Sequence, residues 1–565
     1  MKKLIFVASL ILFFTIGAGI QAAPINESLD FNINSEYDVS GRGELTATLV
    51  KTTQKLYFFV DKNWWDSHTE LSQREILDSF RFLNQDFENK IYPNLTSIFG
   101  SEWNPGIDNE ERITILFHPM REGARGYFRE TDQYLKLQIP ESNEREMLYL
   151  STTQIDSPQI KAFLAHEFLH LITFNQKNRI QGVSEEIWLN EARAEYVSTA
   201  LGYDDVYEGS NLQWRAKTFL EQPSDPITEW KSKKYDYASV NIFIQYLVEH
   251  YGIGILASSL KSELVGIPSL NKALIENGFE EDFSQIFTDW TVAALINDCS
   301  LKQEYCYFSE NLKELRLSPA LNFLPLTGKS SLSVTDVTKN WSASWQKFIG
   351  GHGVLRLKFE SLPGLNFKLP YLIQDINENY SVNFLELGES QAGEIYIPDF
   401  GTKNKALIII PSLQTKILGF DGVEMTYPFT FEGSIVERTP DQEQALIDEL
   451  LSRIEFLKKE VNRLQAKINA ISGINQSSCQ KFESNLYLGM KNSEVQCLQE
   501  FLSSQGSDIY PQGLVTGFFG PLTKAAVIRF QEKYASDILT PLDLEKGTGF
   551  VGLKTRAKIN QLLGK

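Results

Sequence analysis

Residues 165–170 read Ala165-His166-Glu167-Phe168-Leu169-His170, and this stretch decides what is expected of the chain around it. On a helix, residues four apart lie on one face, so the two imidazoles can converge on one metal ion. Glu167 lies one step round the helix, where its carboxylate can take a proton from a water beside the metal. The pattern could also arise by chance in a core helix, but with only six histidines that chance is on the order of one in a few hundred.

A second predicted helix, over residues 188–196, supplies further carboxylates. Glu191 would complete a two-histidine, one-glutamate zinc site that leaves one position open for water. Glu195 follows one turn later on the same face, where it can accept the free ring N–H of a ligand histidine. The alternative for Glu195 is an ordinary solvated helix acid.

The HEFLH stretch followed by NEARAEY at 190–196 resembles the glutamate-type zincins of the thermolysin-like clan. Within that clan the chain is most similar to the hyicolysin-like bacterial metallopeptidases, and the resemblance spans roughly residues 45–300. It implies an α+β zincin domain over residues 45–310 that binds one Zn²⁺. By the same resemblance, the zinc ligands are His166, His170 and Glu191, and Glu167 is the general base and acid.

Enzymes of this kind also use a tyrosine or histidine to stabilise the oxyanion. The segment Tyr235-Asp236-Tyr237, which opens a predicted helix ending at His250, resembles the family's downstream tyrosine-containing helix. Tyr237 is the first choice for this role and Tyr235 the second, while an ordinary packing tyrosine is the alternative. His250 lies at the end of that helix and is interpreted as a capping residue.

The N-terminus predicts export. Lys2 and Lys3 precede an apolar run over residues 4–17 and then small residues, which is typical of a cleaved signal peptide, here residues 1–23. A membrane anchor is the alternative, but the run is shorter than the ~20 residues that a span needs. The mature protein is therefore expected to be secreted or periplasmic, without a membrane segment and with a flexible stretch over residues 24–44.

Composition limits the remaining possibilities. The chain has 565 residues and a formal charge of −18, and such a surface repels nucleic acid. Its four cysteines lie in two close pairs, and in an oxidising compartment these predict the disulfides Cys299–Cys306 and Cys479–Cys497. A four-thiolate metal site is the alternative, which the wide separation of the two pairs disfavours.

Beyond residue 310 the patterns predict domains without catalytic residues. Short Val-, Ile- and Phe-rich segments separated by turn residues predict an all-β sandwich over residues 311–438. Residues 441–471 carry apolar heptads with β-branched residues at one seam position and mostly leucine at the other, which favours a coiled coil that forms a parallel homodimer. A single spacer helix is the alternative.

The last segment, residues 479–565, resembles the three-helix peptidoglycan-binding domain of cell-wall enzymes. The resemblance rests on LGMKNSEVQCLQ at 488–499, TGFFGPLTKAAV at 516–527 and GFVGLKT at 549–555. It implies attachment to peptidoglycan, although such modules also serve as protein-docking domains. The turn Gly517-Phe518-Phe519-Gly520 is expected to expose an aromatic shelf beside a groove.

The sequence as a whole predicts an exported zinc metallopeptidase that cleaves protein or peptide substrates while tethered to the cell wall. Two alternatives remain. The zinc site could cut peptidoglycan crosslink peptides, or the chain could be an inactive wall-bound adhesin or scaffold. The intact motif with its third glutamate disfavours the last.

Overall fold

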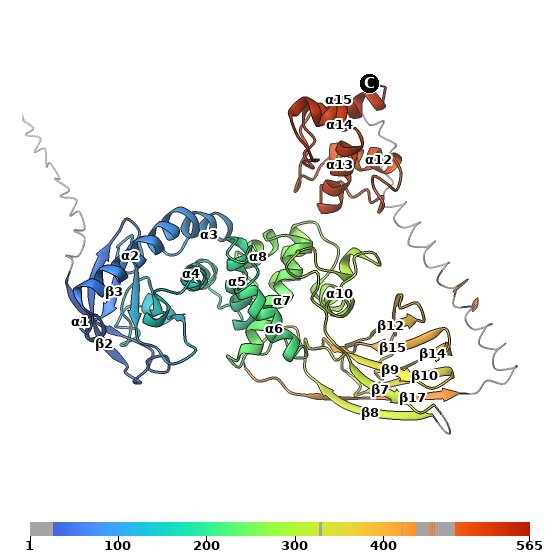
Figure 1. The fold of residues 1–565 in the computed structure, drawn as a ribbon, viewed down its shortest axis with the longest axis horizontal. Coiled ribbons are helices and arrows are strands. Elements are labelled where there is room, and N and C mark those ends of the chain that lie inside the picture. The colour runs from blue at the N-terminus through green and yellow to red at the C-terminus, as the bar shows by residue number, and fades with distance from the viewer. Residues whose placement is uncertain are drawn as a thin grey trace, which may run out of the picture. The chain divides into compact units, whose positions relative to one another are not determined.

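The structure is a computed structural model that describes residues 26–326, 330–420, 422–436, 451–452, 454–455, 457 and 481–564. It divides into two compact units, one reaching to Val436 and one beginning at Glu437 (Figure 1). The predicted signal peptide and most of the predicted coiled coil lie outside the described residues. Within the described ranges, no helix is both long enough and apolar enough to cross a membrane.

A six-stranded mixed sheet forms the N-terminal part of the first unit (Figure 1). The strand order is β1-β2-β3-β4-β6-β5, in which β3, β4 and β6 are parallel and the other pairs are antiparallel. The strands are β1 (Ser28–Asn32), β2 (Glu44–Thr52), β3 (Leu56–Asp61), β4 (Ile113–His118), β5 (Gly126–Phe128) and β6 (Met147–Ser151). The short strand β5 is therefore an edge strand.

Residues 24–44 were expected to be flexible, and for most of them the structure differs. Ser28–Asn32 pair with Glu44–Thr48 as strand β1, and Phe31 packs into a core cluster on one face of the sheet. The loop that follows is held by Asp38, which is buried and accepts hydrogen bonds from Arg42. This segment is polar overall, but the apolar residues Leu29, Phe31 and Ile33 alternate with polar ones. That alternation is sufficient for an edge strand with one buried face.

Helices cover the other face of the sheet and then build the middle of the unit. The α-helices are α1 (Lys62–Asp66), α2 (Glu70–Asp86), α3 (Tyr92–Phe99), α4 (Ile160–Thr173), α5 (Ile187–Ala200), α6 (Asn211–Glu221), α7 (Lys234–Tyr251), α8 (Gly254–Leu260), α9 (Gly266–Glu276) and α10 (Phe283–Ile296). Two π-helical segments continue α2 and α4, namely η1 (Phe87–Ile91) and η4 (Phe174–Gln181). Short 3₁₀ turns are η2 (Glu130–Gln133), η3 (Thr152–Gln154) and η5 (Gln303–Tyr305). Apolar on nearly every side, α4 is a core helix.

The β domain that follows is barrel-like, whereas the sequence predicted a sandwich of two sheets. Two groups of mostly antiparallel strands are joined through one residue pair, Phe400 with Asn404, into a single nine-stranded sheet. The strands of this domain are β7 (Ala320–Leu324), β8 (Ser331–Thr338), β9 (Gln346–Gly350), β10 (Gly353–Ser361), β12 (Pro370–Asp375), β13 (Tyr380–Phe384), β14 (Ala392–Phe400), β15 (Asn404–Ile409) and β17 (Tyr427–Val436), with β11 (Phe367–Lys368) and β16 (Ser412–Leu413) forming a separate pair.

The β domain shares a core with the helices. Trp341 and Trp345 belong to the hydrophobic cluster that α4, α5 and α10 build. The indole N–H of Trp345 donates to the Thr291 carbonyl on α10 at 2.9 Å. Cys299 and Cys306, which follow α10, form the predicted disulfide. The pairing predicted for Cys479 falls on a residue outside the described ranges.

The second unit contains a small helical domain over residues 481–564. Its helices are α12 (Ser493–Ser504), α13 (Pro521–Lys533), α14 (Ala535–Ile538) and α15 (Leu553–Leu562), with the 3₁₀ turn η6 (Thr540–Leu542). They enclose a core of their own, to which Leu498, Phe501, Val527 and Phe530 contribute. Of the predicted coiled coil, residues 451–452, 454–455 and 457 are helical, and Ile454 and Leu457 are about half exposed.

Candidate metal centre

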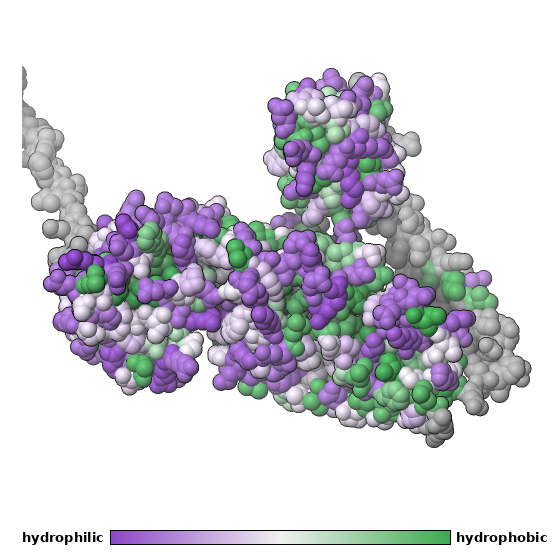
Figure 2. Space-filling view, in the orientation of Figure 1, coloured by the Kyte–Doolittle hydropathy of each residue, from purple (hydrophilic) through white to green (hydrophobic). Residues whose placement is uncertain are grey.

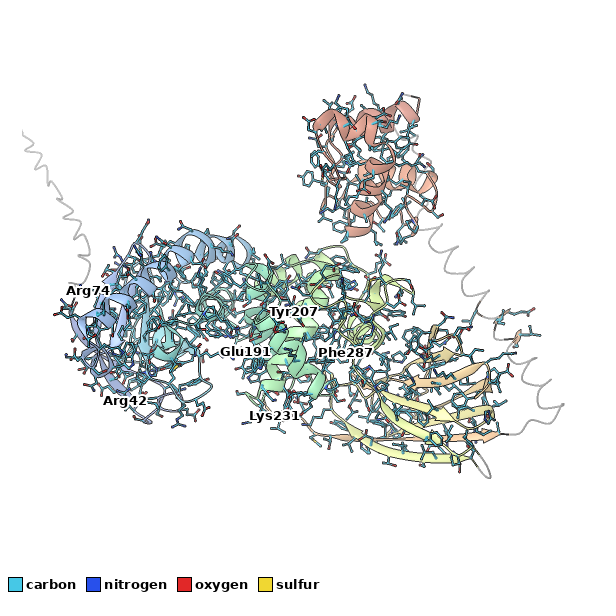
Figure 3. The ribbon with its side chains drawn as sticks, in the orientation of Figure 1. Arg42, Arg74, Glu191, Tyr207, Lys231 and Phe287 are labelled. Carbon is cyan, nitrogen blue, oxygen red and sulfur yellow. A yellow bond between two sulfur atoms is a disulfide. The ribbon has the colours of Figure 1, made fainter. Side chains whose placement is uncertain are left out.

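Two packed helices carry the candidate metal centre. α4 supplies His166 and His170, one turn apart on one face. α5 supplies Glu191, which is labelled in Figure 3. The Nε2 atoms of the two histidines lie 3.2 Å apart. Oε2 of Glu191 lies 3.3 Å from Nε2 of His166 and 3.7 Å from Nε2 of His170. Among the described residues, this is the group of histidine, cysteine and acidic side chains that could hold a metal ion.

The geometry of these three residues fits zinc. Ligand atoms about 2.0–2.1 Å from a tetrahedral zinc ion lie about 3.3 Å from one another, close to the observed separations. Oε2 of Glu191 is buried and has no hydrogen-bond partner, which is costly for a carboxylate unless a cation satisfies it. Burial alone would raise the pKa of Glu191, but the adjacent His170 and His166 lower it, so the carboxylate is ionised.

Glu167 lies on α4 between the two histidines in sequence, and its side chain is buried. Burial raises its pKa, against the opposing effect of His166 and His170. Its Oε1 is so close to strand β5 that a Cβ atom added at Gly126 would lie 3.1 Å away from it. The edge strand therefore passes directly beside this carboxylate.

The rings of the two histidines are oriented by different neighbours. Nδ1 of His170 lies 3.1 Å from Oδ1 of Asn190, an acceptor that would hold a proton on this nitrogen and leave Nε2 to a metal. For His166, the nearest acid to Nδ1 is Glu195, at 3.8 Å, which is longer than a hydrogen bond. Sequence reasoning did not identify Asn190, although it directly precedes the third ligand.

Glu195 forms stronger contacts elsewhere. Its carboxylate accepts hydrogen bonds from Nε of Arg215 on α6 at 2.7 Å, from Asn211 at 3.1 Å and from Asn241 at 3.2 Å. Burial would raise its pKa, but the Arg215 guanidinium outweighs burial and lowers it. Glu195 is thus a buried anion that ties α5 to α6 and α7 behind His166. Arg215 is a second residue that sequence reasoning missed.

The two candidate tyrosines on α7 differ in position. Tyr237 is half-buried, its ring lies 4.8 Å from Trp230, and the Arg215 guanidinium lies 4.9 Å from its ring centre. Burial raises the pKa of Tyr237 most, and the negative charge of Glu191 raises it further. Tyr235 instead directs its hydroxyl to the exposed Glu221, at 3.4 Å. The structure therefore brings Tyr237, and not Tyr235, toward the metal cluster.

Two further residues, His250 and Tyr37, differ in their relation to the metal cluster. His250 lies at the C-terminal end of α7, where its Nε2 is 3.0 Å from the Cys306 carbonyl, so it binds the disulfide segment. Tyr37, in the loop expected to be flexible, stacks on Tyr127 of β5 at 4.6 Å. Burial and then the charges of Glu167 and Glu191 raise the pKa of Tyr37. No local sequence signal could have linked Tyr37 to this site.

A cavity of about 520 Å³ is lined by residues of the segment that continues α4, and none of the metal-cluster residues lines it. Its wall includes Phe174, one turn after His170 on the continuing helix, together with Trp103, Tyr134 and Arg179. Phe128 of β5 connects this wall to the metal cluster, since its ring lies 6.3 Å from Phe174 and 6.5 Å from His170. The cavity is large enough for a large side chain, and Phe128 and Phe174 lie between it and His170.

Comparisons with known proteins identify the C-terminal module. Residues 491–535 match the family described as "Putative peptidoglycan binding domain". The chain therefore carries a peptidoglycan-binding domain, which associates it with the cell wall. No curated protein matches the chain.

Some solved structures are also similar to parts of the chain. The Yersinia pseudotuberculosis-derived mitogen is 10% identical, with 20% of this chain and 92% of that chain covered and a TM-score of 0.15. The lysozyme inhibitor PliG of Aeromonas hydrophila is 7% identical, with 21% and 100% covered and a TM-score of 0.14. The pre-peptidase C-terminal domain of a Bacillus anthracis collagenase is 8% identical, with 21% and 95% covered and a TM-score of 0.13. Scores this low support no conclusion about fold or function.

Proposed function

We propose that this chain is an exported zinc peptidase that its C-terminal module holds on the cell wall. The observation that carries the proposal is the buried, unpartnered Oε2 of Glu191 facing the Nε2 atoms of His166 and His170. The three ligand atoms converge on one point, where a cation would satisfy the carboxylate and both imidazoles together, and this favours a metal site over an inactive scaffold.

His166, His170 and Glu191 would hold the zinc. A bound zinc ion would supply Lewis acidity and lower the pKa of a water molecule. The water can then lose a proton near neutral pH and attack a peptide carbonyl. Glu167 takes the proton from the attacking water and passes it to the leaving amine. Its raised pKa makes Glu167 a stronger base for the first step, and the leaving amine is basic enough to take the proton in the second.

Two further groups would act on the substrate. Tyr237 would donate a hydrogen bond to the oxyanion, since burial and the charge of Glu191 raise the pKa of its hydroxyl and keep it protonated. An extended substrate chain running beside β5 passes Glu167 and can place one side chain in the cavity next to Phe174. Edge strands offer unpaired backbone groups for such pairing.

A second candidate reaction is the hydrolysis of peptidoglycan crosslink peptides. The peptidoglycan-binding domain favours it, because that domain would bring the same zinc site to wall peptides. The two reactions use the same residues and differ in substrate.

One experiment tests both. Purified protein is incubated with casein and with purified sacculi, with and without a zinc chelator, beside a Glu167→Gln variant. We expect chelation to abolish cleavage and Glu167→Gln to keep the zinc while activity falls by about 10³-fold. Normal cleavage by Glu167→Gln would refute the mechanism, and release of wall peptides without casein cleavage would select the second reaction.

A further inference from the structure

The two halves of the C-terminal module repeat one structural device. In the first half, Gln499 of α12 is buried, and its Nε2 donates to the Phe518 carbonyl at 2.7 Å and to the Thr523 hydroxyl at 2.9 Å. Its Oε1 accepts from the backbone N–H of Thr516 and of Gly517, both at 2.8 Å. One glutamine side chain thus fixes a whole turn.

Gln531 of α13 makes the same contacts in the second half. Its Nε2 donates to the Phe550 carbonyl at 2.8 Å and to the Thr555 hydroxyl at 3.0 Å. Its Oε1 accepts from the N–H of Thr548 at 2.8 Å and of Gly549 at 2.9 Å. The offset from glutamine to the first turn residue is 17 positions in both halves. Only the first of these turns lies within the matched residues 491–535.

The two turns differ in what they expose. In the first turn Phe519 is fully buried and Phe518 is partly buried, so this turn exposes one ring in part and not two. In the second turn Phe550, at the position equivalent to Phe518, is 41% exposed and Val551 is buried. The second turn therefore exposes more of its aromatic ring than the first.

A second exposed ring accompanies Phe550. Backbone pairing of Leu486 with Val551 brings Tyr487 beside it, with ring centres 6.1 Å apart and planes inclined by 20°. Tyr487 is 52% exposed. Gly552 makes room for this arrangement, because a Cβ atom there would lie 2.9 Å from the Phe550 ring. Two nearly parallel rings are thus held at the surface by a buried glutamine and a glycine.

We propose that Tyr487 and Phe550 form a platform on which a sugar ring of the peptidoglycan glycan strand stacks. Exposed aromatic surface on a small domain marks an interaction site, since the fold gains nothing by leaving it in water. The occupant follows from the domain's family match. The face of an exposed aromatic ring complements the apolar C–H face of a sugar. Hydrophobic side chains also lie among hydrophilic ones on the face of this unit in Figure 2.

The test compares platform variants with matched controls in the full-length chain. Tyr487→Ala and Phe550→Ala remove a ring each, while Leu514→Ala and Leu542→Ala remove apolar side chains of similar exposure, 49% and 50%, elsewhere in the module. We expect binding to purified sacculi to weaken at least tenfold for each platform variant and to stay unchanged for the controls. Phe550→Tyr should retain binding, and thermal unfolding should show that all variants fold.

A second arm identifies the ligand. Glycan strands freed of stem peptides by an amidase should bind the wild-type chain as well as intact sacculi do. Platform variants that bind like the controls would overturn the proposal, and so would loss of binding when the stem peptides are removed. Neither arm depends on peptidase activity, so failure of the catalytic proposal would leave this result intact.

Discussion

The metal cluster and the aromatic platform position their functional groups in opposite ways. In the first unit, the candidate ligands are carried by two packed core helices, and their spacing follows from the helical repeat. In the C-terminal module, the exposed rings come from loops, and a buried Gln531 fixes the turn that carries Phe550. The positions of side chains on a helix follow from their spacing in the sequence. The positions of side chains on a loop depend here on a buried residue from another part of the chain.

The sharpest way to test this contrast is to remove the third ligand. Glu191→Ala should lose nearly all bound zinc and all activity, because two histidines alone leave the site without its anionic ligand. Binding to sacculi should not change. Elemental analysis and sedimentation measure the two properties, and Glu276→Ala on α9 serves as the control for an exposed helix glutamate. Zinc retained by Glu191→Ala would move the third ligand elsewhere, with Glu195 as the nearest acid.

A smaller effect is expected from the oxyanion donor. Tyr237→Phe should lower kcat about 10²-fold with little change in KM, because the hydroxyl acts mainly in the transition state. Tyr235→Phe is the matched control, since that hydroxyl binds Glu221. If Tyr235→Phe has the larger effect, the roles assigned to the two tyrosines must be exchanged.

A still smaller effect is expected from the hydrogen bond that orients the His170 ring. Asn190→Ala removes the acceptor for Nδ1 of His170 and should weaken zinc binding by about 10-fold or somewhat more. Competition with a chelator measures the affinity. Asn178→Ala, in the segment that continues α4, is the control. An unchanged affinity would show that packing alone orients the ring.

Individual residues show which parts of the fold and of the metal centre could be predicted from the sequence. The spacing of His166 and His170 was sufficient to predict that the two imidazoles converge. The contact of Arg215 with Glu195 and the approach of Tyr37 to the cluster depend on how separate segments pack, which no local pattern encodes. The aromatic shelf was expected at the turn Gly517–Gly520, which carries two phenylalanines, whereas the turn Gly549–Gly552 carries one. Only burial shows that the second turn exposes its ring.

The smallest expected effect separates the two turns of the module. Gln499→Leu and Gln531→Leu each remove a buried side chain that satisfies several backbone groups, so each should lower the free energy of unfolding of the module by about 2 kcal/mol. Gln561→Leu, at an exposed position on α15, should cost far less. Well below the melting temperature, only Gln531→Leu should weaken binding to glycan strands, because only its turn carries Phe550 of the platform. The loss should be several-fold and smaller than that of Phe550→Ala, since the ring is still present but less firmly held. Equal binding losses for Gln499→Leu and Gln531→Leu would mean that both turns contact the wall, and the platform would then be only half of the binding surface.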